Sequence, residues 1–296
     1  MSSEPSLSSV AVVTVSYNSS AEMAPFLSSV TESEGAPVRV VVADNDSADA
    51  SETRRITLDE KATFLPTGGN HGYGGAMNRG VASLGPDIDA VLISNPDVVI
   101  HPGAISRLLA VLASSESIGA VGPRVLNPDG STYPSARALP SLRSGIGHAL
   151  FGEIWPTNPW SASYRVDMSD VSATRDVGWL SGSCLLVRRS AFEAIGGFDE
   201  GFFMYFEDVD LGRRLHEAGW RSVYVPDASV THTGAHSTST DSVKMIRAHH
   251  ASAYRYLKKK YPSALYSPIR LALRIGLAAR AQYLIIRARR RRSSVG

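Results

Sequence analysis

The sequence predicts an α/β protein in which helices flank a mostly parallel sheet, followed by a helical, basic C-terminal extension. Short runs of β-branched and other apolar residues alternate with helical stretches, and the connections are short, which is typical of doubly wound parallel sheets. The runs are apolar throughout, as expected of strands that are covered on both faces. With 43% hydrophobic and 20% charged residues, the 296-residue chain can bury a substantial core, which excludes an intrinsically disordered protein.

Turn-forming residues separate the predicted strands and helices. Residues 10–17 (VAVVTVSY) predict a buried strand, and Gly35 and Pro37 end the helix that comes next. A glycine-rich loop is expected at 68–75, and residues 127–158, rich in Pro, Ser and Gly, are expected to be irregular. Strands are expected at 10–17, 38–43, 63–65, 90–94, 120–121, 179–188 and 222–225. Helices are expected at 21–34, 50–61, 76–84, 105–114, 189–195, 207–218, 243–260 and 268–292.

Polar side chains gather where the predicted strands end, at Asn18, Asp44, Asp46, Asn95 and Asp97. In open α/β sheets, ligands bind outside the carboxyl ends of the strands, so these residues are expected to line one edge of one cleft. Asp97 can bind a hard cation that a nucleotide diphosphate would bridge, and Asp44 can accept hydrogen bonds from a base or a ribose. The alternative is structural, because Asn-Pro-Asp is also an ordinary turn and a strand-end aspartate can cap the next helix.

The glycine-rich segment GGNHGYGG does not match the phosphate-binding P-loop and is not a clean dinucleotide-binding fingerprint. Its glycines still allow the backbone to approach a ligand closely. Asn78 and Arg79 follow it and are candidate substrate-binding residues, because arginine pairs well with phosphate. The alternative is a flexible loop whose arginine is solvated.

Three carboxylates, Glu207, Asp208 and Asp210, fall within four residues directly after an aromatic run at 202–206. A carboxylate positioned beside an attacking hydroxyl can act as a general base, and crowded carboxylates in a partly apolar site can have raised pKa values. The alternative is a helix start, where the helix dipole favours acidic residues.

His232 follows the last short predicted strand in the segment VTHTG. A lone histidine is usually structural, but paired with Asp97 it could complete a divalent metal site beside a diphosphate. His236 is a weaker candidate for the same position.

Taken in order, these motifs resemble the inverting family 2 glycosyltransferases of the GT-A fold, over about residues 10–236. Within that family the chain is similar to bacterial rhamnosyltransferases. The segments that carry the resemblance are VVTVSYNS, VVVADNDS, NHGYGGAMNRG, LISNPDV, GWLSGSCLLVRR, GGFDEGFFMYFEDVDLGRRLHEAGW and VTHTGAHS.

The resemblance implies a role for each matching position. Asp44 would contact the base or ribose of the donor. Asn95 and Asp97 occupy the family's D-x-D site, with Asn95 in place of the first aspartate, so that Asp97 carries the charge that holds Mg²⁺ or Mn²⁺. His232 matches the family's downstream metal-ligand histidine.

The resemblance also implies the chemistry and the substrates. Asp208 matches the catalytic base, Glu207 lies beside it as a candidate substrate-binding residue, and Trp179 and Gly182 fall in the segment that lines the acceptor site. The implied donor is dTDP-L-rhamnose and the implied acceptor is a polyprenyl-diphosphate-linked GlcNAc, as in cell-wall linker assembly. One displacement would invert the anomeric centre, with no covalent enzyme intermediate.

The charges are unevenly distributed along the chain. From residue 242 onward there are 14 Lys+Arg and no Asp or Glu, which leaves 16 Lys+Arg against 28 Asp+Glu, a net charge of −12, in residues 1–241. Basic tails usually meet nucleic acid or anionic lipid, or are simply solvated. No nucleic-acid-reading motif is recognisable, and residues 268–292 mix leucine and isoleucine with arginine, which suits an interfacial helix on an anionic membrane surface.

These patterns predict a GT-A domain at 1–241 and an extension at 242–296 that meets the membrane or a second subunit. The single cysteine, Cys184, indicates a reducing compartment, and the N-terminal residues lack the basic region of a secretory signal. We therefore expect a cytoplasmic protein, peripheral on the inner face of the plasma membrane. The alternatives are another family 2 transferase, such as a galactofuranosyl or O-antigen rhamnosyl enzyme, a nucleotidyltransferase, or a non-catalytic membrane-recruitment module that binds a nucleotide.

Overall fold

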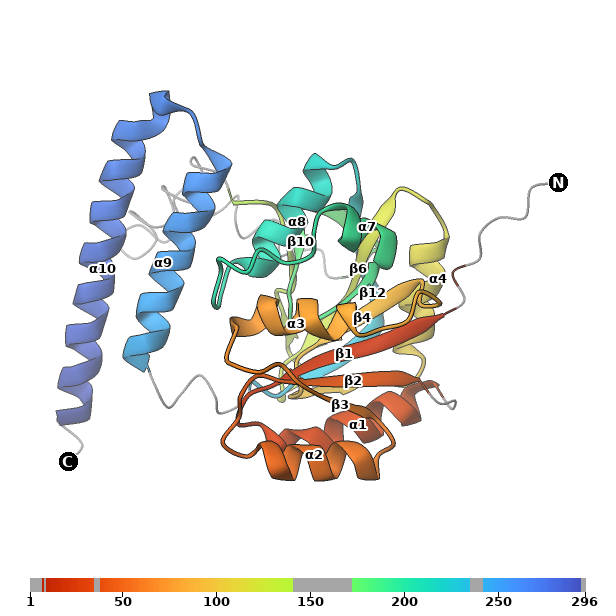
Figure 1. The fold of residues 1–296 in the computed structure, drawn as a ribbon. Helices are drawn as coiled ribbons and strands as arrows, with labels where there is room; N and C mark the ends of the chain where they lie inside the picture. The colour runs from red at the N-terminus through yellow and green to blue at the C-terminus, as the bar shows by residue number, and fades with distance from the viewer. Residues whose placement is uncertain (1–6, 8, 35–37, 141–171, 235–241, 294–296) are drawn as a thin grey trace.

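One ten-stranded sheet forms the centre of the computed structural model, which describes residues 7, 9–34, 38–140, 172–234 and 242–293 (Figure 1). Its order is β3-β2-β1-β4-β11-β6-β12-β5, with β7 beside β6 and β9 beside β12, and β8 and β10 form a separate pair. The strands are β1 Val10–Ser16, β2 Arg39–Asp44, β3 Thr63–Pro66, β4 Ala90–Ser94, β5 Val98–Ile100, β6 Ile118–Leu126, β7 Thr132–Tyr133, β8 Ala136–Arg137, β9 Arg175–Val177, β10 Trp179–Leu180, β11 Cys184–Arg188 and β12 Arg221–His232. The helices are α1 Ser20–Glu34, α2 Ala50–Asp59, α3 Gly72–Ala82, α4 Ala104–Ala113, α7 Arg189–Ala194, α8 Glu207–Glu217, α9 Ser242–Lys260, the 3₁₀ helix η2 Ala264–Tyr266 and α10 Ser267–Ser293.

The sheet is mostly parallel, which confirms the predicted fold class. β1 runs parallel to both neighbours, with Val12 opposite Val40 on β2 and Leu92 on β4. β6 and β12 are also parallel to each other. In the middle of the sheet, β11 runs antiparallel to both β4 and β6. The short strands β5 and β9 are antiparallel to β12, and β7 is antiparallel to β6.

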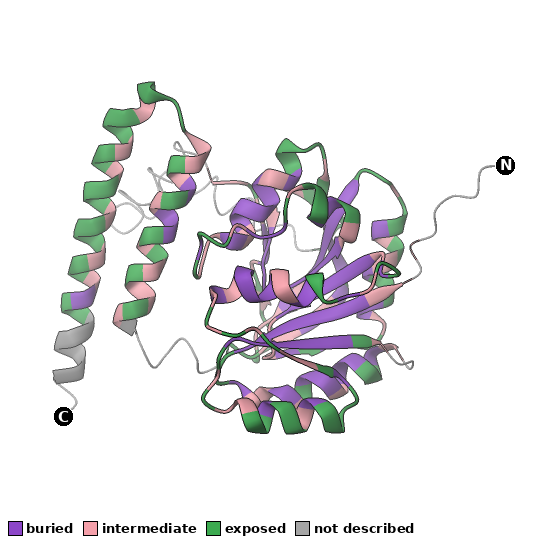
Figure 2. Ribbon diagram, viewed as in Figure 1, coloured by how far each residue is buried: buried purple, intermediate pink, exposed green. Residues whose placement is uncertain are grey.

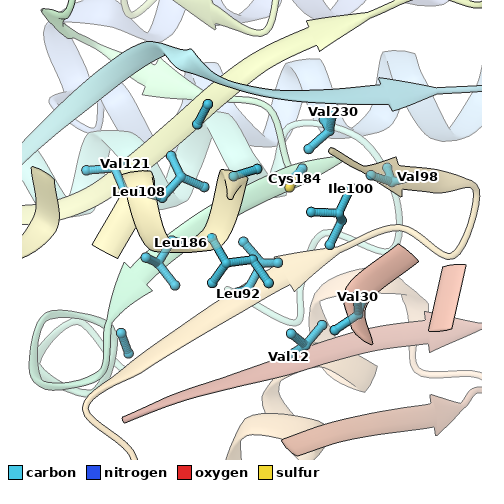
Figure 3. Packing of buried hydrophobic residues seen from close by; sticks show 14 of the residues in the cluster. Val12, Val30, Leu92, Val98, Ile100, Leu108, Val121, Cys184, Leu186 and Val230 are labelled. Carbon is cyan, nitrogen blue, oxygen red and sulfur yellow. The ribbon is translucent and has the colours of Figure 1, made fainter. Parts of the chain in front are cut away.

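Helices cover both faces of the sheet, which explains why the strands are apolar without interruption (Figure 2). Alternation along β1 sends Val12 to the face covered by α1 and α4, and Val13 to the face covered by α3, α7 and α8. Figure 3 shows the first of these clusters, where Cys184 also lies buried among valine and leucine side chains. Burying such a side chain fully contributes about 1.5–3 kcal/mol.

The glycine-rich segment is helical earlier than expected, because α3 begins at Gly72 rather than after residue 75. Its glycines allow the helix to lie close to its neighbours. A Cβ at Gly74 would lie 2.8 Å from the Cβ of Phe198, and a Cβ at Gly80 would collide with Val13 on β1. The segment that we expected to be a loop is therefore helical. Only small residues at Gly74 and Gly80 allow this helix to lie so close to Phe198 and to β1.

The predicted strand at 179–188 is divided into β10 and β11 by a turn at residues 181–183, which we call the 181–183 turn. β6 and β12 are longer than expected, and β12 continues to His232. β5 and β9 were not predicted, and β7 and β8 lie in the stretch expected to be irregular, of which residues 141–158 are outside the described part.

A buried ion-pair cluster attaches α9 to α8. The carboxylate of Asp210 is fully buried and lies 2.8 Å from Arg213, 2.7 Å from Arg214 and 2.8 Å from Lys259 of α9. Lys259 also pairs with Asp199 at 2.7 Å. Burial alone would raise the pKa of Asp210, but hydrogen bonds from these three cations lower it. This third carboxylate of the acidic cluster is therefore held by ion pairs within the fold, which the sequence analysis did not predict.

The basic extension forms a helical hairpin against the body, with α10 on the outer side of α9 (Figure 1). Tyr256 of α9 is fully buried against Phe202 and Val209, and Arg255 pairs with Asp199 at 2.9 Å. The two helices predicted for this region are thus confirmed. No helix in the described part of the chain is both long and apolar enough to cross a membrane.

Candidate functional site

The 181–183 turn joins two chemically important segments. The backbone N–H of Gly182 donates to Oδ2 of Asp208 at 3.0 Å, on the first turn of α8. The carbonyl of the next residue, Ser183, accepts from the N–H of Asn95 at 2.9 Å, just beyond the end of β4. One short turn therefore fixes the predicted base relative to the strand end that carries Asn95 and Asp97.

Asp97 and His232 face each other at this strand end. Oδ1 of Asp97 lies 3.1 Å from Nε2 of His232, and the amide of Asn95 lies 3.4 Å from the same nitrogen. Thr233 holds the Asp97 carbonyl through its N–H at 3.0 Å. The two side chains are 11% and 22% exposed, so they border solvent. His236 lies outside the described residues.

The donor set at Asp97 and His232 fits a divalent cation. One carboxylate oxygen and one imidazole nitrogen converge within 3.1 Å, and both atom types bind Mg²⁺ or Mn²⁺. No group of three His, Cys, Asp or Glu side chains able to hold a metal occurs among the described residues. An ion at this pair would therefore take its remaining ligands from a bound substrate, from water or from neutral groups.

Glu207, which is buried, and Asp208, which is half-buried, are adjacent at the start of α8. The two residues before them, Tyr205 and Phe206, both have φ of +67°, a left-handed conformation that costs energy for bulky side chains. This backbone turns the chain so that the first helical turn points into the interior. Glu207 is only 8% exposed, and its Oε2 has no hydrogen-bond partner among the described residues.

Burial controls the protonation of this pair. It raises the pKa of Glu207 to about 8, and the neighbouring charge of Asp208 adds to the effect. Burial also raises the pKa of Asp208, although the N–H of Gly182 opposes that change by stabilising the carboxylate. Two adjacent carboxyl groups that both resist ionisation can hold one proton between them, which suits a group that must take a proton near neutral pH.

Tyr73 connects this pair to the Asp97 end of the site. Burial raises the pKa of its phenol well above the usual value, and the charges of Glu207, Asp208 and Asp97 add to the effect. The charges of the predicted base and of the predicted metal ligand therefore both oppose ionisation of this phenol. The sequence analysis missed Tyr73, because it lies in the glycine-rich segment that read as a loop.

The strand-end residues of β1 and β2 make one compact loop. Oδ1 of Asn18 accepts from the N–H of Ala48 at 2.8 Å, and Oδ1 of Asp44 accepts from the N–H of Ser47 at 3.1 Å. This bond lies in the loop before α2, whose N-cap residue is Asp49, so Asp44 does not cap that helix. The buried Oδ2 of Asp44 has no partner among the described residues. Asp46 adopts φ of +68° in the same loop. Binding of a donor by these residues stays a prediction.

Asn45 is a further residue that the sequence analysis did not single out. Its Oδ1 accepts from the N–H of His71 at 2.9 Å, and its Nδ2 donates to Oδ1 of Asn70 at 3.1 Å and to the carbonyl of Gly72 at 3.2 Å. It therefore fixes the start of α3 to the end of β2. The sequence analysis named Asp44 and Asp46 because carboxylates can bind a ligand, whereas an asparagine between two aspartates carries no pattern that indicates a structural role.

Asn78 and Arg79 are engaged within the fold. The side-chain amide of Asn78 donates to the carbonyl of Phe198 and accepts from its N–H, both at 2.9 Å. Arg79 donates to the carbonyl of Gly75 at 2.7 Å and pairs with Glu200 at 3.3 Å. Both residues hold α3 to the loop before α8, and their contact with a substrate stays a prediction.

Trp179 lies on β10, at the approach to the 181–183 turn. Its Nε1 donates to the carbonyl of Ala138 at 3.1 Å, and the guanidinium of Arg137 lies 5.6 Å from its ring centroid. Arg137 also acts electrostatically on Asp208 and favours its ionised form. The aromatic ring, the cation and the predicted base thus belong to one region.

Comparison of sequences groups the chain with known transferases. The family described as glycosyltransferase like family 2 matches residues 5–253. The N-acetylglucosaminyl-diphospho-decaprenol L-rhamnosyltransferase of Mycobacterium tuberculosis is 47% identical over 291 residues, which cover 95% of this chain and 94% of that protein. The rhamnosyltransferase WbbL of Escherichia coli is 28% identical, over 75% of this chain and 83% of that protein.

Solved structures share the fold at low sequence identity. A mannosyltransferase from Pyrobaculum calidifontis, in complex with GDP-Man and Mn²⁺, aligns with a TM-score of 0.57 and 17% identity over 94% of this chain and 79% of that one. GalNAc-T7 with UDP, GalNAc and Mn²⁺ aligns with a TM-score of 0.56 and 13% identity over 81% and 48%.

We expect Glu207→Gln to stabilise the protein at pH 8 by roughly 1–3 kcal/mol. The folded wild type keeps a proton on Glu207 up to about pH 8, whereas the unfolded chain releases it near pH 4–5. Wild-type stability therefore falls as pH rises across this window, and the neutral glutamine removes that loss. Urea unfolding at pH 5 and pH 8 measures the effect.

The matched control is Glu217→Gln at the other end of α8, where the side chain is 57% exposed. That variant should change stability by about 1 kcal/mol or less and should keep the wild-type pH dependence. If Glu207→Gln and the wild type lose stability equally between pH 5 and pH 8, Glu207 ionises normally in the folded protein.

Proposed function

The chain belongs to glycosyltransferase family 2, and on that premise we propose that it transfers L-rhamnose from dTDP-L-rhamnose to the 3-hydroxyl of GlcNAc-diphosphoryl-polyprenol. The observation that carries the proposal is the 47% identity, over 95% of this chain and 94% of the relative, to an enzyme named for rhamnosyl transfer to GlcNAc-diphospho-decaprenol. The product would be a rhamnosyl-GlcNAc lipid for cell-wall linker assembly. The arrangement of Asp208, Asp97 and His232 supports the chemistry that this transfer needs.

Asp208 serves as the base. The acceptor hydroxyl approaches the anomeric carbon from the face opposite the leaving diphosphate, and Asp208 takes its proton as the new C–O bond forms. The N–H of Gly182, 3.0 Å from Oδ2, holds the carboxylate in one orientation during this step. A single displacement inverts the centre, so a β-L donor gives an α-L-rhamnoside.

Asp97 and His232 would hold a divalent cation, Mg²⁺ or Mn²⁺, against the donor diphosphate. Such an ion neutralises the charge that develops on the departing nucleoside diphosphate. The 3.1 Å approach of Oδ1 to Nε2 supports a shared ion, and Asn95 contributes a neutral amide where the family has a first aspartate. Asp44 and the loop at the ends of β1 and β2 would hold the nucleoside, and Trp179 and Gly182 would line the acceptor side.

The exposed side of α10 would lie on the membrane that holds the lipid-linked acceptor. Leu271 and Ile275, one helical turn apart, are 58% and 61% exposed. Arg280 and Arg287 are exposed on the same helix, and the extension carries no acidic residue. Apolar side chains among arginines favour the headgroup region of an anionic bilayer. We place the protein in the cytoplasm, at the inner face of the plasma membrane.

Product analysis tests the proposed function. The protein is incubated with dTDP-L-rhamnose and a short-chain GlcNAc-diphosphoryl lipid, and the lipid product is examined by mass spectrometry and NMR. We expect one added deoxyhexose in α linkage at O3 and release of dTDP. Transfer only from another nucleotide sugar, or only to another acceptor, would favour a different family 2 transferase.

Asp208→Asn should lower turnover by about 10²–10⁴-fold and leave dTDP binding and the melting temperature near the wild-type values. The control is Asp210→Asn, two residues further along α8. It deprives Arg213, Arg214 and Lys259 of a buried partner, so it should cost about 3–5 kcal/mol of stability. Full activity of Asp208→Asn in steady-state assays would exclude it as the base.

Asp97→Ala and His232→Ala should each weaken Mn²⁺ binding in the presence of dTDP by at least tenfold in titration calorimetry, because each removes one of two side-chain ligands. Excess EDTA should stop transfer by the wild type. The control is His101→Gln, since the His101 ring bonds the hydroxyls of Ser229 and Thr231 on β12 and neither proposed ligand. Unchanged metal affinity in both alanine variants would contradict the assignment.

Replacing Leu271 and Ile275 together by glutamine should reduce binding to vesicles that contain phosphatidylglycerol, by about tenfold in sedimentation assays, because the apolar contact with the bilayer is lost. The control is Leu58→Gln on α2, where the side chain is 53% exposed. Unchanged vesicle binding, together with loss of a dimer in analytical ultracentrifugation, would assign this face of α10 to a second subunit.

A further inference from the structure

Tyr73 reaches the base through one glycine. Its hydroxyl, on the first turn of α3, donates to the carbonyl of Gly182 at 2.5 Å, and the N–H of the same glycine donates to Oδ2 of Asp208 at 3.0 Å. The two peptide groups that flank Gly182 are thus held from opposite sides, by the phenol and by the carboxylate. Movement of that glycine would change the hydrogen bond that orients Asp208.

The ring of Tyr73 also packs at this point. A Cβ built on Gly182 would lie 3.5 Å from Cε1 of Tyr73 and 3.4 Å from the Cβ of Asp208. The ring of Tyr73 and the side chain of Asp208 therefore lie on the side of Gly182 that a side chain would occupy, at ordinary contact distance from that position. Both neighbours are thus close enough to border the 181–183 turn.

Tyr73 is itself rigidly held. Its N–H donates to the carbonyl of Phe203 at 3.1 Å, and its ring meets that of Phe198 edge to face at 5.9 Å. Gly72 makes this approach possible, because its φ is +72° and a Cβ there would collide with the Phe203 backbone. The start of α3 is thereby fixed to the loop that precedes α8, and Tyr73 can transmit that position to Gly182.

The electrostatic setting makes Tyr73 a permanent donor. Burial, and then the charges of Glu207 and Asp208, raise the pKa of the phenol well above its usual value, so the hydroxyl keeps its proton whenever the carboxylates ionise. The other charged group that acts on Asp208 is Arg137 of β8, which favours the carboxylate. A phenol whose pKa is raised in this way keeps its proton near neutral pH, which suits donation of a hydrogen bond to a carbonyl.

We propose that Tyr73 is a positioning residue, which holds the Gly182 peptide so that its N–H orients and stabilises the Asp208 carboxylate. The inference rests on the proposed function of Asp208 as the base. It goes further, because it names the side chain that makes the 181–183 turn rigid, and it links the glycine-rich helix to proton transfer.

Tyr73→Phe tests the inference, because it removes the hydroxyl and keeps the ring against Phe198. We expect kcat to fall by about 3–10-fold, as for one lost hydrogen bond, with the KM for dTDP-L-rhamnose within about twofold of the wild type. The acidic limb of the kcat–pH profile should move to higher pH, because a less firmly held N–H stabilises the carboxylate less. Unchanged kcat and an unchanged profile would overturn the proposal.

Measuring Tyr73→Phe in the Asp208→Asn variant separates a positioning role from a general loss of structure. If Tyr73 acts through Asp208, Tyr73→Phe should cause no further loss of turnover when added to Asp208→Asn. Losses that multiply would show that the hydroxyl acts elsewhere. The control is Tyr256→Phe, since the buried Tyr256 hydroxyl has no hydrogen-bond partner among the described residues, and this variant should match the wild type in kcat and profile.

The carboxyl titration is also measured without substrate, by ¹³C NMR of aspartate-labelled protein. Tyr73→Phe should move the Asp208 midpoint to higher pH, and an identical midpoint would count against the proposal. This arm is independent of the rhamnosyl assay. A wild type that forms no rhamnosylated lipid would therefore reject the proposed function alone, while the titration still decides on Tyr73.

Discussion

The 181–183 turn is the constraint on which the site depends. It interrupts what would otherwise be one strand, and its buried backbone groups bind different partners: the N–H of Gly182 donates to Asp208, and the carbonyl of Ser183 accepts from Asn95. β11, which begins at the next residue, lies antiparallel between β4 and β6 and fixes the turn at the carboxyl end of β4. The proposed base on α8 and the proposed metal-binding pair at the strand end are thereby linked through backbone groups of one turn.

The buried carboxylates at the start of α8 require strong support from their surroundings. Burial disfavours the ionised forms of Glu207 and Asp208, and the backbone before them is strained. In the same first turn of α8, two residues after Asp208, Asp210 joins three cations, one of them Lys259 of α9. The C-terminal extension is therefore part of the framework that holds the helix of the proposed base, in addition to its proposed contact with the membrane.

Much of the fold could be predicted from the sequence, because apolar runs and strand-end polar residues are local signals. The pairing of Asp97 with His232 agrees with the predicted metal site in geometry, although its role stays a prediction. The break within residues 179–188 was missed, although Ser181-Gly182-Ser183 is a turn-forming run, because the apolar residues on both sides resemble one strand. The contact that the turn makes could not be predicted, since Asp208 lies 26 residues away from Gly182. Tyr73 was missed for a similar reason, because the glycines that seat α3 closely against its neighbours are also the residues that typify loops.

A crystal structure of the protein with dTDP, Mn²⁺ and a GlcNAc-diphosphate acceptor analogue tests the central claim most directly. We expect anomalous scattering to place Mn²⁺ between Asp97, His232 and the diphosphate, with an acceptor hydroxyl within hydrogen-bond distance of Asp208 and the Gly182 N–H still bound to that carboxylate. A metal held by other residues, or an acceptor whose hydroxyls all point away from Asp208, would contradict a single site organised by the 181–183 turn.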